Sequence, residues 1–154
     1  MKPRVANANT MNEMEMVNVK NQMKMGEMMK KIGKGKRKVS VTFSLGSRRY
    51  MSKLIDELKK QMVTYEKQLP NVFNFFDYLK KQVEVVKGKK KEKTKTVLLS
   101  YEELDFLKIQ IKETTKGIKM ETEKLKWYNL MKKALYKTLL KQNELLLSEL
   151  NGAK

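Results

Sequence analysis

A helical period of apolar residues in the middle of the chain is the strongest constraint on the fold. Six of them recur at spacings of 4, 3, 4, 3 and 4: Met51, Ile55, Leu58, Met62, Tyr65 and Leu69. This spacing puts them all on one face of an α-helix, which then has to pack on other helices. We therefore predict a helix that Ser47 caps and that runs to about Gln68.

The next segment carries a similar stripe. Pro70 interrupts the first helix and is placed to begin a second one, which we expect to end near Gly88. One face of this helix holds Val72, Phe76, Leu79, Val83 and Val86. Phe73 and Phe75 lie off that stripe, and we expect them to fill a second packing surface instead of stacking on bases.

The C-terminal part begins with a capping box. Ser100 and Glu103 have the spacing that satisfies two free backbone N–H groups, and Leu99 and Leu104 are placed for a hydrophobic staple. Gly117 could end, kink or only weaken the helix that follows. A helical pattern then continues through Leu125, Trp127, Leu130, Met131, Leu135, Leu139, Leu145, Leu146 and Leu150. Asn151 and Gly152 provide its stop.

The N-terminal part has a different character. Thr10 and Glu13 fit a capping box that would start a helix over about 11–32, which Gly33 would stop. Eight of the twelve Met lie at positions 1–29, which suits either a core helix or an adaptable partner-binding face. Val39 to Leu45 then alternates apolar and polar residues, as a strand does. Its partner would be Thr94 to Leu99, although an extended tether explains the pattern equally well.

These patterns predict a mainly α protein. We expect a Met-rich basic arm over 1–46 that is partly helical, and a small helical bundle over 47–150. A basic loop at 87–96 would interrupt the bundle, and residues 151–154 would form a tail. The two interpretations of Val39 to Leu45 leave open whether the fold includes a short β-ribbon.

Charge is the second strong feature of the chain. Lys and Arg number 35 against 17 Asp and Glu, which gives a net charge of +18. The excess is concentrated in 1–49, with 12 basic and 3 acidic residues, and in 85–96, with 6 and 1. The excess positive side chains repel one another when the chain compacts, unless nucleic-acid phosphates or acidic lipids neutralise them. The plainer alternative is a lysine-rich surface that is merely solvated.

Several function classes are excluded or disfavoured. The chain has no Cys and no His, which removes disulfides, Cys/His zinc sites and His-based acid–base catalysis. Gly33 and Gly35 lack the remainder of a phosphate-loop motif, and the carboxylates do not form an acid–base pair. We expect no catalytic residues, no metal and no cofactor. With neither a secretory signal nor an 18-residue apolar window, we expect a cytoplasmic or virion protein without a membrane span.

The basic clusters are the candidate site. Lys outnumbers Arg 31 to 4, and Lys is a point charge that suits phosphates more than base edges. Arg48 and Arg49 stand at a helix start, where an anion would be favourable, unless both are simply solvated. The candidate nucleic-acid-binding residues are Lys20, Lys24, Lys30, Lys31, Lys34, Lys36, Arg37, Lys38, Arg48, Arg49, Lys89, Lys90, Lys91 and Lys93.

In architecture and composition the whole chain resembles the nucleocapsid coat proteins of filamentous archaeal viruses. The resembling parts are the basic arm through Arg49 and the bundle from Met51 to Leu150. Proteins of that class wrap the viral duplex with a basic helical arm and carry a C-terminal helical bundle. The strand pattern at Val39 to Leu45 departs from their all-helical architecture.

The resemblance implies a structural protein that coats or compacts nucleic acid, with double-stranded DNA as the expected partner. It would bind without reading sequence and would act in a homo- or hetero-oligomeric assembly. Two other classes stay open. One is a helical adaptor or virion protein whose Met-rich helix docks in a partner's groove. The other is a peripheral membrane-surface protein with basic amphipathic helices.

Overall fold

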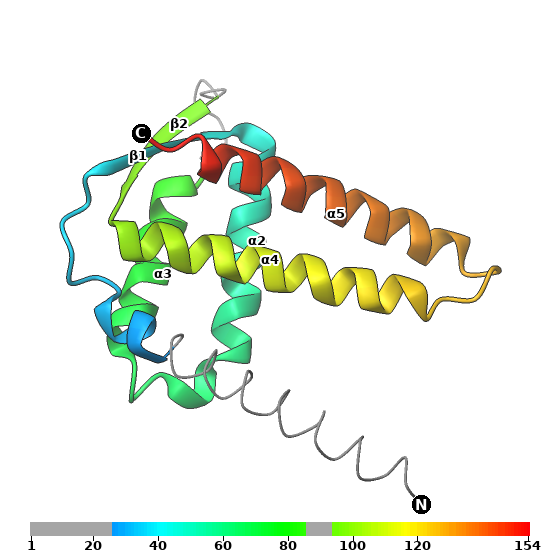
Figure 1. Ribbon diagram of the computed structural model, residues 1–154, viewed down its shortest axis with the longest axis horizontal. Helices are drawn as coiled ribbons and strands as arrows, with labels where there is room; N and C mark the ends of the chain where they lie inside the picture. The colour runs from blue at the N-terminus through cyan, green and yellow to red at the C-terminus, as the bar shows by residue number, and fades with distance from the viewer. Residues whose placement is uncertain (1–25, 86–93) are drawn as a thin grey trace, which may run out of the picture.

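The computed structural model describes residues 26–85 and 94–154. Residues 26–31 are helical, and an extended segment then leads into the first strand. The elements that follow are β1 (Val39–Ser44), α2 (Leu45–Gln61), the short 3-10 helix η1 (Val63–Tyr65), α3 (Pro70–Val83), β2 (Thr94–Leu99), α4 (Tyr101–Glu123) and α5 (Leu130–Asn151) (Figure 1). The predicted fold class, a mainly helical bundle, is confirmed.

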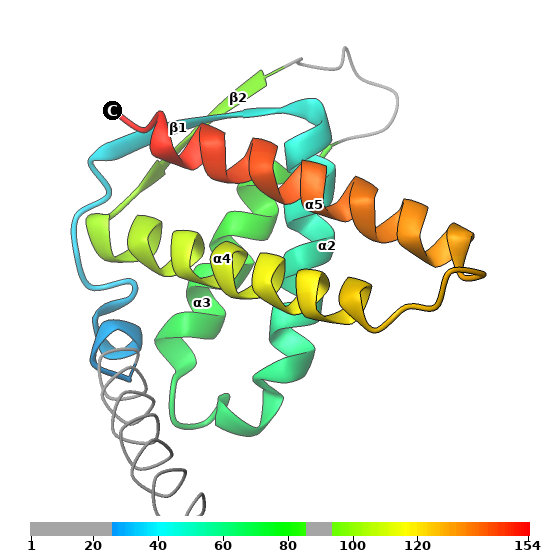
Figure 2. The ribbon, with the colours of Figure 1, turned by 45° about the vertical axis from the view of Figure 1, so that its right-hand side comes forward.

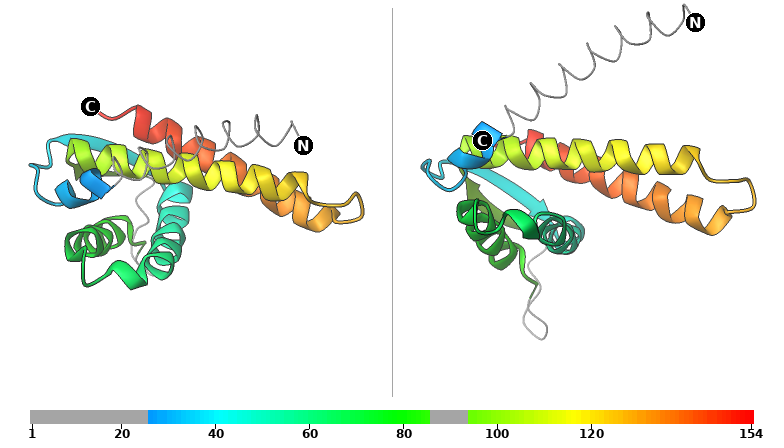
Figure 3. Two further views of the ribbon diagram at one scale, coloured as in Figure 1. Left: turned by 60° about the horizontal axis from the view of Figure 1, so that its bottom comes forward. Right: turned by 90° about the horizontal axis from the view of Figure 1, so that it is seen from below.

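The helices form two crossing pairs. Helices α2 and α3 lie side by side and antiparallel in one layer, and α4 and α5 form a long hairpin in a second layer (Figure 3). The two strands lie at one end of the molecule, beside the start of α2 and the end of α5. The far end of the hairpin extends beyond the other layer (Figures 1 and 3).

The two strands pair as an antiparallel ribbon, which confirms the predicted partners. Val39 lies opposite Leu99 and Val41 lies opposite Val97. One face of the ribbon is buried in the core; the other is mostly polar, although it includes Leu98, and the hydroxyls of Thr42 and Thr96 lie 3.0 Å apart on it. An isolated two-stranded ribbon is barely stable in water, so packing on the helices stabilises this one.

The hydrophobic core includes residues that the sequence assigned to the arm. Ile32, Val41 and Phe43 are fully buried, together with Met51 and Ile55 of α2. The boundary that we expected between the arm and the bundle, at 46/47, therefore falls between residues that pack in the same core. The reason is that β1 alternates, so its apolar side chains turn inward although exposed lysines at 34, 36 and 38 precede it.

Helix α2 is shorter than its apolar stripe predicted. Its N-cap is Ser44, whose side-chain oxygen accepts from the Ser47 N–H, so the prediction that Ser47 caps the helix is wrong. The helix ends at Gln61 instead of Gln68, and Tyr65 at the end of the stripe is exposed. Proline disfavours helical geometry at the residue before it, so Leu69 is not helical and Pro70 starts α3 as predicted.

An aromatic cluster joins the two layers. Phe75 and Phe76 of α3 pack against Phe106 of α4, with ring centroids 6.4 and 6.0 Å apart. Phe73 is also buried and meets Phe76 edge to face. The expectation that Phe73 and Phe75 serve packing is confirmed. Helix α4 starts at the predicted capping box and runs through Gly117 without a break.

The distal half of the hairpin holds partly buried residues but none that is fully buried. Past Ile111 on α4, and before Asn143 on α5, no residue falls in the buried class. The apolar pattern that continues through Trp127 and Leu135 is split into two antiparallel helices joined by residues 124–129, and much of it faces solvent. The expectation that this stripe packs inside a bundle is wrong for its first half, whereas Leu146 and Leu150 do reach the core.

Candidate nucleic-acid interface

A groove of about 680 Å³ lies between the first half of α2 and the end of α3. Its lining residues are Arg49, Ser52, Lys53, Asp77, Lys80, Lys81, Val83, Glu84 and Val85. Four of these side chains are cationic and two are anionic. Residues 86–93, which hold most of the predicted basic loop, follow the groove directly in sequence and lie outside the described residues.

Ion pairs between the two helices neutralise part of this charge. Lys59 of α2 pairs with Asp77, and Lys80 of α3 pairs with Asp56. Within residues 26–85 and 94–154, no ion pair involves Arg49, Lys53 or Lys81, and all three side chains are exposed. We call them the groove cations. Glu84 is the one lining carboxylate that is left to offset them, so the groove keeps a net positive charge.

Arg48 has a structural position, unlike its neighbour Arg49. Its side chain is 5% exposed, and its guanidinium donates to the carbonyls of Val83 (3.4 Å) and Glu84 (2.7 Å). These carbonyls lie at the C-terminal end of α3, where free acceptors and the helix dipole favour a cation. Arg48 therefore connects the start of α2 to the end of α3. Of these two arginines, only Arg49 lines the groove.

The chain itself supplies the anion at the start of α2. The Glu149 carboxylate of α5 accepts a hydrogen bond from the Ser44 N–H at 2.9 Å. Arg48 and Arg49 in the sequence favoured an external anion near this helix start. The Glu149 carboxylate binds the N-cap residue Ser44 at this position, so we place the candidate anion site in the groove instead of at the helix end.

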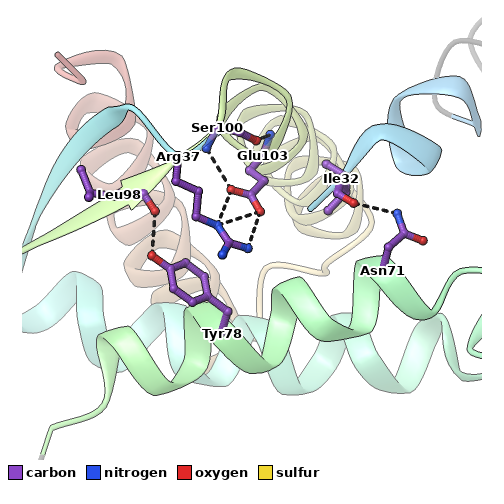
Figure 4. A network of polar contacts seen from close by, with 7 residues as sticks. All are labelled: Ile32, Arg37, Asn71, Tyr78, Leu98, Ser100 and Glu103. Atoms are coloured by element: carbon purple, nitrogen blue, oxygen red, sulfur yellow. Dashed lines mark hydrogen bonds and ion pairs between the residues drawn. The ribbon is translucent and has the colours of Figure 1, made fainter. Parts of the chain in front are cut away.

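Arg37 is held by a buried carboxylate (Figure 4). Its Nε donates to both oxygens of Glu103, at 3.0 and 3.2 Å, and Nη2 donates to Oε2 at 2.8 Å. The guanidinium also lies over the Tyr78 ring, 3.7 Å from its centroid. The hydrogen bond with Glu103 raises the pKa of Arg37, against the opposing effect of burial. The same carboxylate accepts from the Ser100 N–H at 2.9 Å, so one Glu both caps α4 and anchors Arg37.

The chain matches no family model, no curated protein and no solved structure. A proposal for the function therefore rests on the positions and charges of this chain's own residues. No helix in the two described ranges combines the length and the apolar character that a bilayer span requires. The same residues contain no group of three or more carboxylates that could hold a metal ion.

The remaining predicted lysines in the described part form a second basic surface. We call Lys30, Lys31, Lys34, Lys36 and Lys38 the N-terminal lysine cluster; all five are exposed. Their segment is held at two points, because Asn71 donates to the Ile32 carbonyl at 2.9 Å and Arg37 binds Glu103. None of the five lines the groove. Lys20, Lys24, Lys89, Lys90, Lys91 and Lys93 lie outside the described residues.

Sequence analysis missed two of the groove cations. Lys53 lies one turn after Arg49 on α2, and this i, i+4 spacing could have identified the shared face. Lys81 belongs to α3 and reaches the groove only because α3 packs antiparallel to α2. No local pattern indicates that pairing, so Lys81 could not have been added to Arg49 and Lys53 from the sequence.

Proposed function

We propose that this is a structural, non-catalytic protein that binds the phosphate backbone of nucleic acid, with duplex DNA as its partner. The observation that supports it most is the groove, where Arg49, Lys53 and Lys81 have no ion pair within the described residues. Unneutralised cations gathered in a concave surface concentrate positive potential and attract a polyanion.

The form of the groove favours backbone contact over base reading. Two of its three groove cations are lysines, which act as point charges towards phosphates, whereas base edges favour paired arginine contacts. Arg37 and Arg48, which sequence analysis included among the binding residues, have their guanidinium groups engaged by Glu103 and by the end of α3. Binding should therefore be indifferent to DNA sequence.

The N-terminal lysine cluster supplies a second contact surface. It lies near the starts of α3 and α4, as the bonds from Asn71 and Arg37 indicate, whereas the groove lies at the opposite end of α3. Two basic surfaces on one molecule suit a protein that coats or compacts a duplex in an oligomeric assembly, in a virion or in the cytoplasm. The resemblance to viral nucleocapsid coat proteins stays a prediction.

Binding of labelled duplexes, followed by fluorescence anisotropy, tests the proposal. Two duplexes of unrelated sequence should bind with affinities within about twofold of each other, because phosphate contacts carry no sequence information. The groove variant Arg49→Gln/Lys53→Gln/Lys81→Gln should bind roughly 10- to 100-fold more weakly at low salt.

A matched control separates position from net charge. Lys112, Lys116 and Lys119 on α4 are exposed, form no ion pair within the described residues, and carry the same three charges. Their replacement by Gln should change the affinity by no more than about threefold if the groove is the interface. Equal losses of affinity in the two variants would mean that binding depends only on the net charge of the protein. A larger loss in the control would place the interface on the hairpin.

A further inference from the structure

The far end of the α4–α5 hairpin carries an exposed apolar patch. The hairpin extends past the body of the molecule, and its connecting residues lie at the extreme end (Figure 2). We define the hairpin tip as residues 119–137. Its exposed large apolar side chains are Met120, Trp127, Tyr128, Leu130, Met131 and Leu135. Trp127 is 80% exposed and Met131 is 89% exposed, and each of the other four side chains is more than half exposed.

Lysines alternate with these apolar residues along the hairpin tip. The hairpin tip holds six Lys and two Glu, which gives it a net charge of +4. One of these lysines, Lys124, is paired with Glu121, and Lys126 lies over the ring of Tyr128, 5.8 Å from its centroid. Trp127 and Tyr128 meet edge to face at 5.9 Å, so the two rings stand together at the turn.

We propose that the hairpin tip docks on a membrane surface rich in anionic lipids. Tryptophan and tyrosine favour the headgroup level, and Leu130 and Met131 can enter the boundary of the acyl chains. The lysines of the hairpin tip can keep their ammonium groups beside lipid phosphates while their stems cover apolar surface. The position at the end of a projecting hairpin lets the tip reach a flat surface before the body does.

The charge and the side-chain types of the hairpin tip favour an anionic membrane surface over a second copy of the chain and over single-stranded nucleic acid. A second copy of the chain would bring another tip of net charge +4 against the first, and the two would repel. Single-stranded nucleic acid would stack on Trp127 and Tyr128. However, the other four apolar side chains are aliphatic and offer no ring face to a base. The hairpin tip is separate from the groove, so this inference does not rest on the proposed function.

Trp127 is the single tryptophan of the chain and therefore reports on the tip directly. The full-length protein is titrated with vesicles of phosphatidylcholine alone, and with vesicles that also contain phosphatidylglycerol. We expect a blue shift of the emission only with the anionic vesicles. Added salt should weaken the binding without removing it, because apolar insertion is not screened.

Two variants with the same charge change separate insertion from attraction. Leu130→Asp/Met131→Asp places the change in the tip, and Val63→Asp/Tyr65→Asp places it on η1, whose side chains are also exposed. The tip variant should partition into anionic vesicles at least about tenfold more weakly, and the η1 variant should stay within about threefold of the unaltered protein. Vesicle cosedimentation of Trp127→Ser gives a second readout, which should also be weakened.

Several results would overturn the proposal. One is the absence of a blue shift with anionic vesicles. Another is an equal loss of vesicle binding in the two aspartate variants. Self-association through the tip in lipid-free solution, seen by sedimentation and lost in the tip variant, would assign the patch to a second copy. A Trp127 response to single-stranded DNA that displaces the vesicles would assign it to nucleic acid.

Discussion

Replacing Arg37 with methionine should destabilise the fold far more than replacing a neighbouring lysine. The Glu103 side chain is 0% exposed, and its carboxylate accepts three hydrogen bonds from Arg37 and one from the Ser100 N–H. Methionine keeps much of the apolar stem of Arg37 but removes the guanidinium. The Glu103 carboxylate would then stay buried with one donor.

The expected loss follows from the burial of the two partners. Removing one member of a buried ion pair costs about 3–5 kcal/mol, because the other charge is left uncompensated. The Arg37 side chain is 33% exposed, so water can reach the site in the variant, and we take the lower end, about 3 kcal/mol. The lost contact with the Tyr78 ring adds about 0.5–1 kcal/mol. For a domain of this size, the melting temperature should drop by roughly 10 °C.

Urea denaturation followed by far-UV circular dichroism measures this loss, because Trp127 at the hairpin tip does not report on the core. Lys36→Met is the control: Lys36 is exposed and without an ion pair in the described residues, so its loss should stay within about 0.5 kcal/mol. Combining Arg37→Met with Glu103→Leu should recover part of the stability, since no charge is then buried. An Arg37→Met variant as stable as the control would refute the structural role of the pair.

Three further results are expected. Leu58→Ala should lower the free energy of unfolding by about 2–5 kcal/mol in a chemical melt, because Leu58 is buried on α2. A fragment over 26–154 should give a cooperative thermal melt and one over 47–154 should not, because the latter lacks the buried strand β1. Burial raises the pKa of Tyr50 and Tyr78 above the ordinary 10.0. The contribution of these two tyrosines to stability should therefore be constant below pH about 10 and decrease above it, as the unfolded chain releases those protons first, and replacing both by Phe should remove this decrease in pH-dependent melts.

The features that sequence analysis predicted correctly are set by local chemistry. The capping box of Ser100 and Glu103 depends on a three-residue spacing, and the start of α3 depends on the fixed backbone of Pro70. The alternation of apolar and polar residues identified Val39 to Leu45 as a strand, and its partner was identified because Thr94 to Leu99 is also rich in Thr and Val. The capping box and the start of α3 need information from only a few neighbouring positions, whereas the strand pairing joins two segments far apart in sequence.

The features that were missed depend on contacts between distant parts of the chain. Arg37 stands among exposed lysines, and nothing nearby in sequence indicates that Glu103, 66 positions away, binds it. The apolar pattern around Leu130 has the helical period whether it is buried or exposed, so it predicts a packed bundle where the structure has a projecting hairpin. The groove likewise exists only after α2 and α3 have packed together.

The dependence of duplex binding on salt distinguishes a positioned interface from a generally basic surface. The logarithm of the binding constant should fall linearly with the logarithm of salt concentration, because each neutralised phosphate releases condensed counterions. Removing the three groove cations should make this slope shallower by roughly 2 to 3, given about 0.9 per phosphate contact. Removing Lys112, Lys116 and Lys119 should leave it almost unchanged. Equal slopes for the unaltered protein and the groove variant would contradict phosphate binding in the groove.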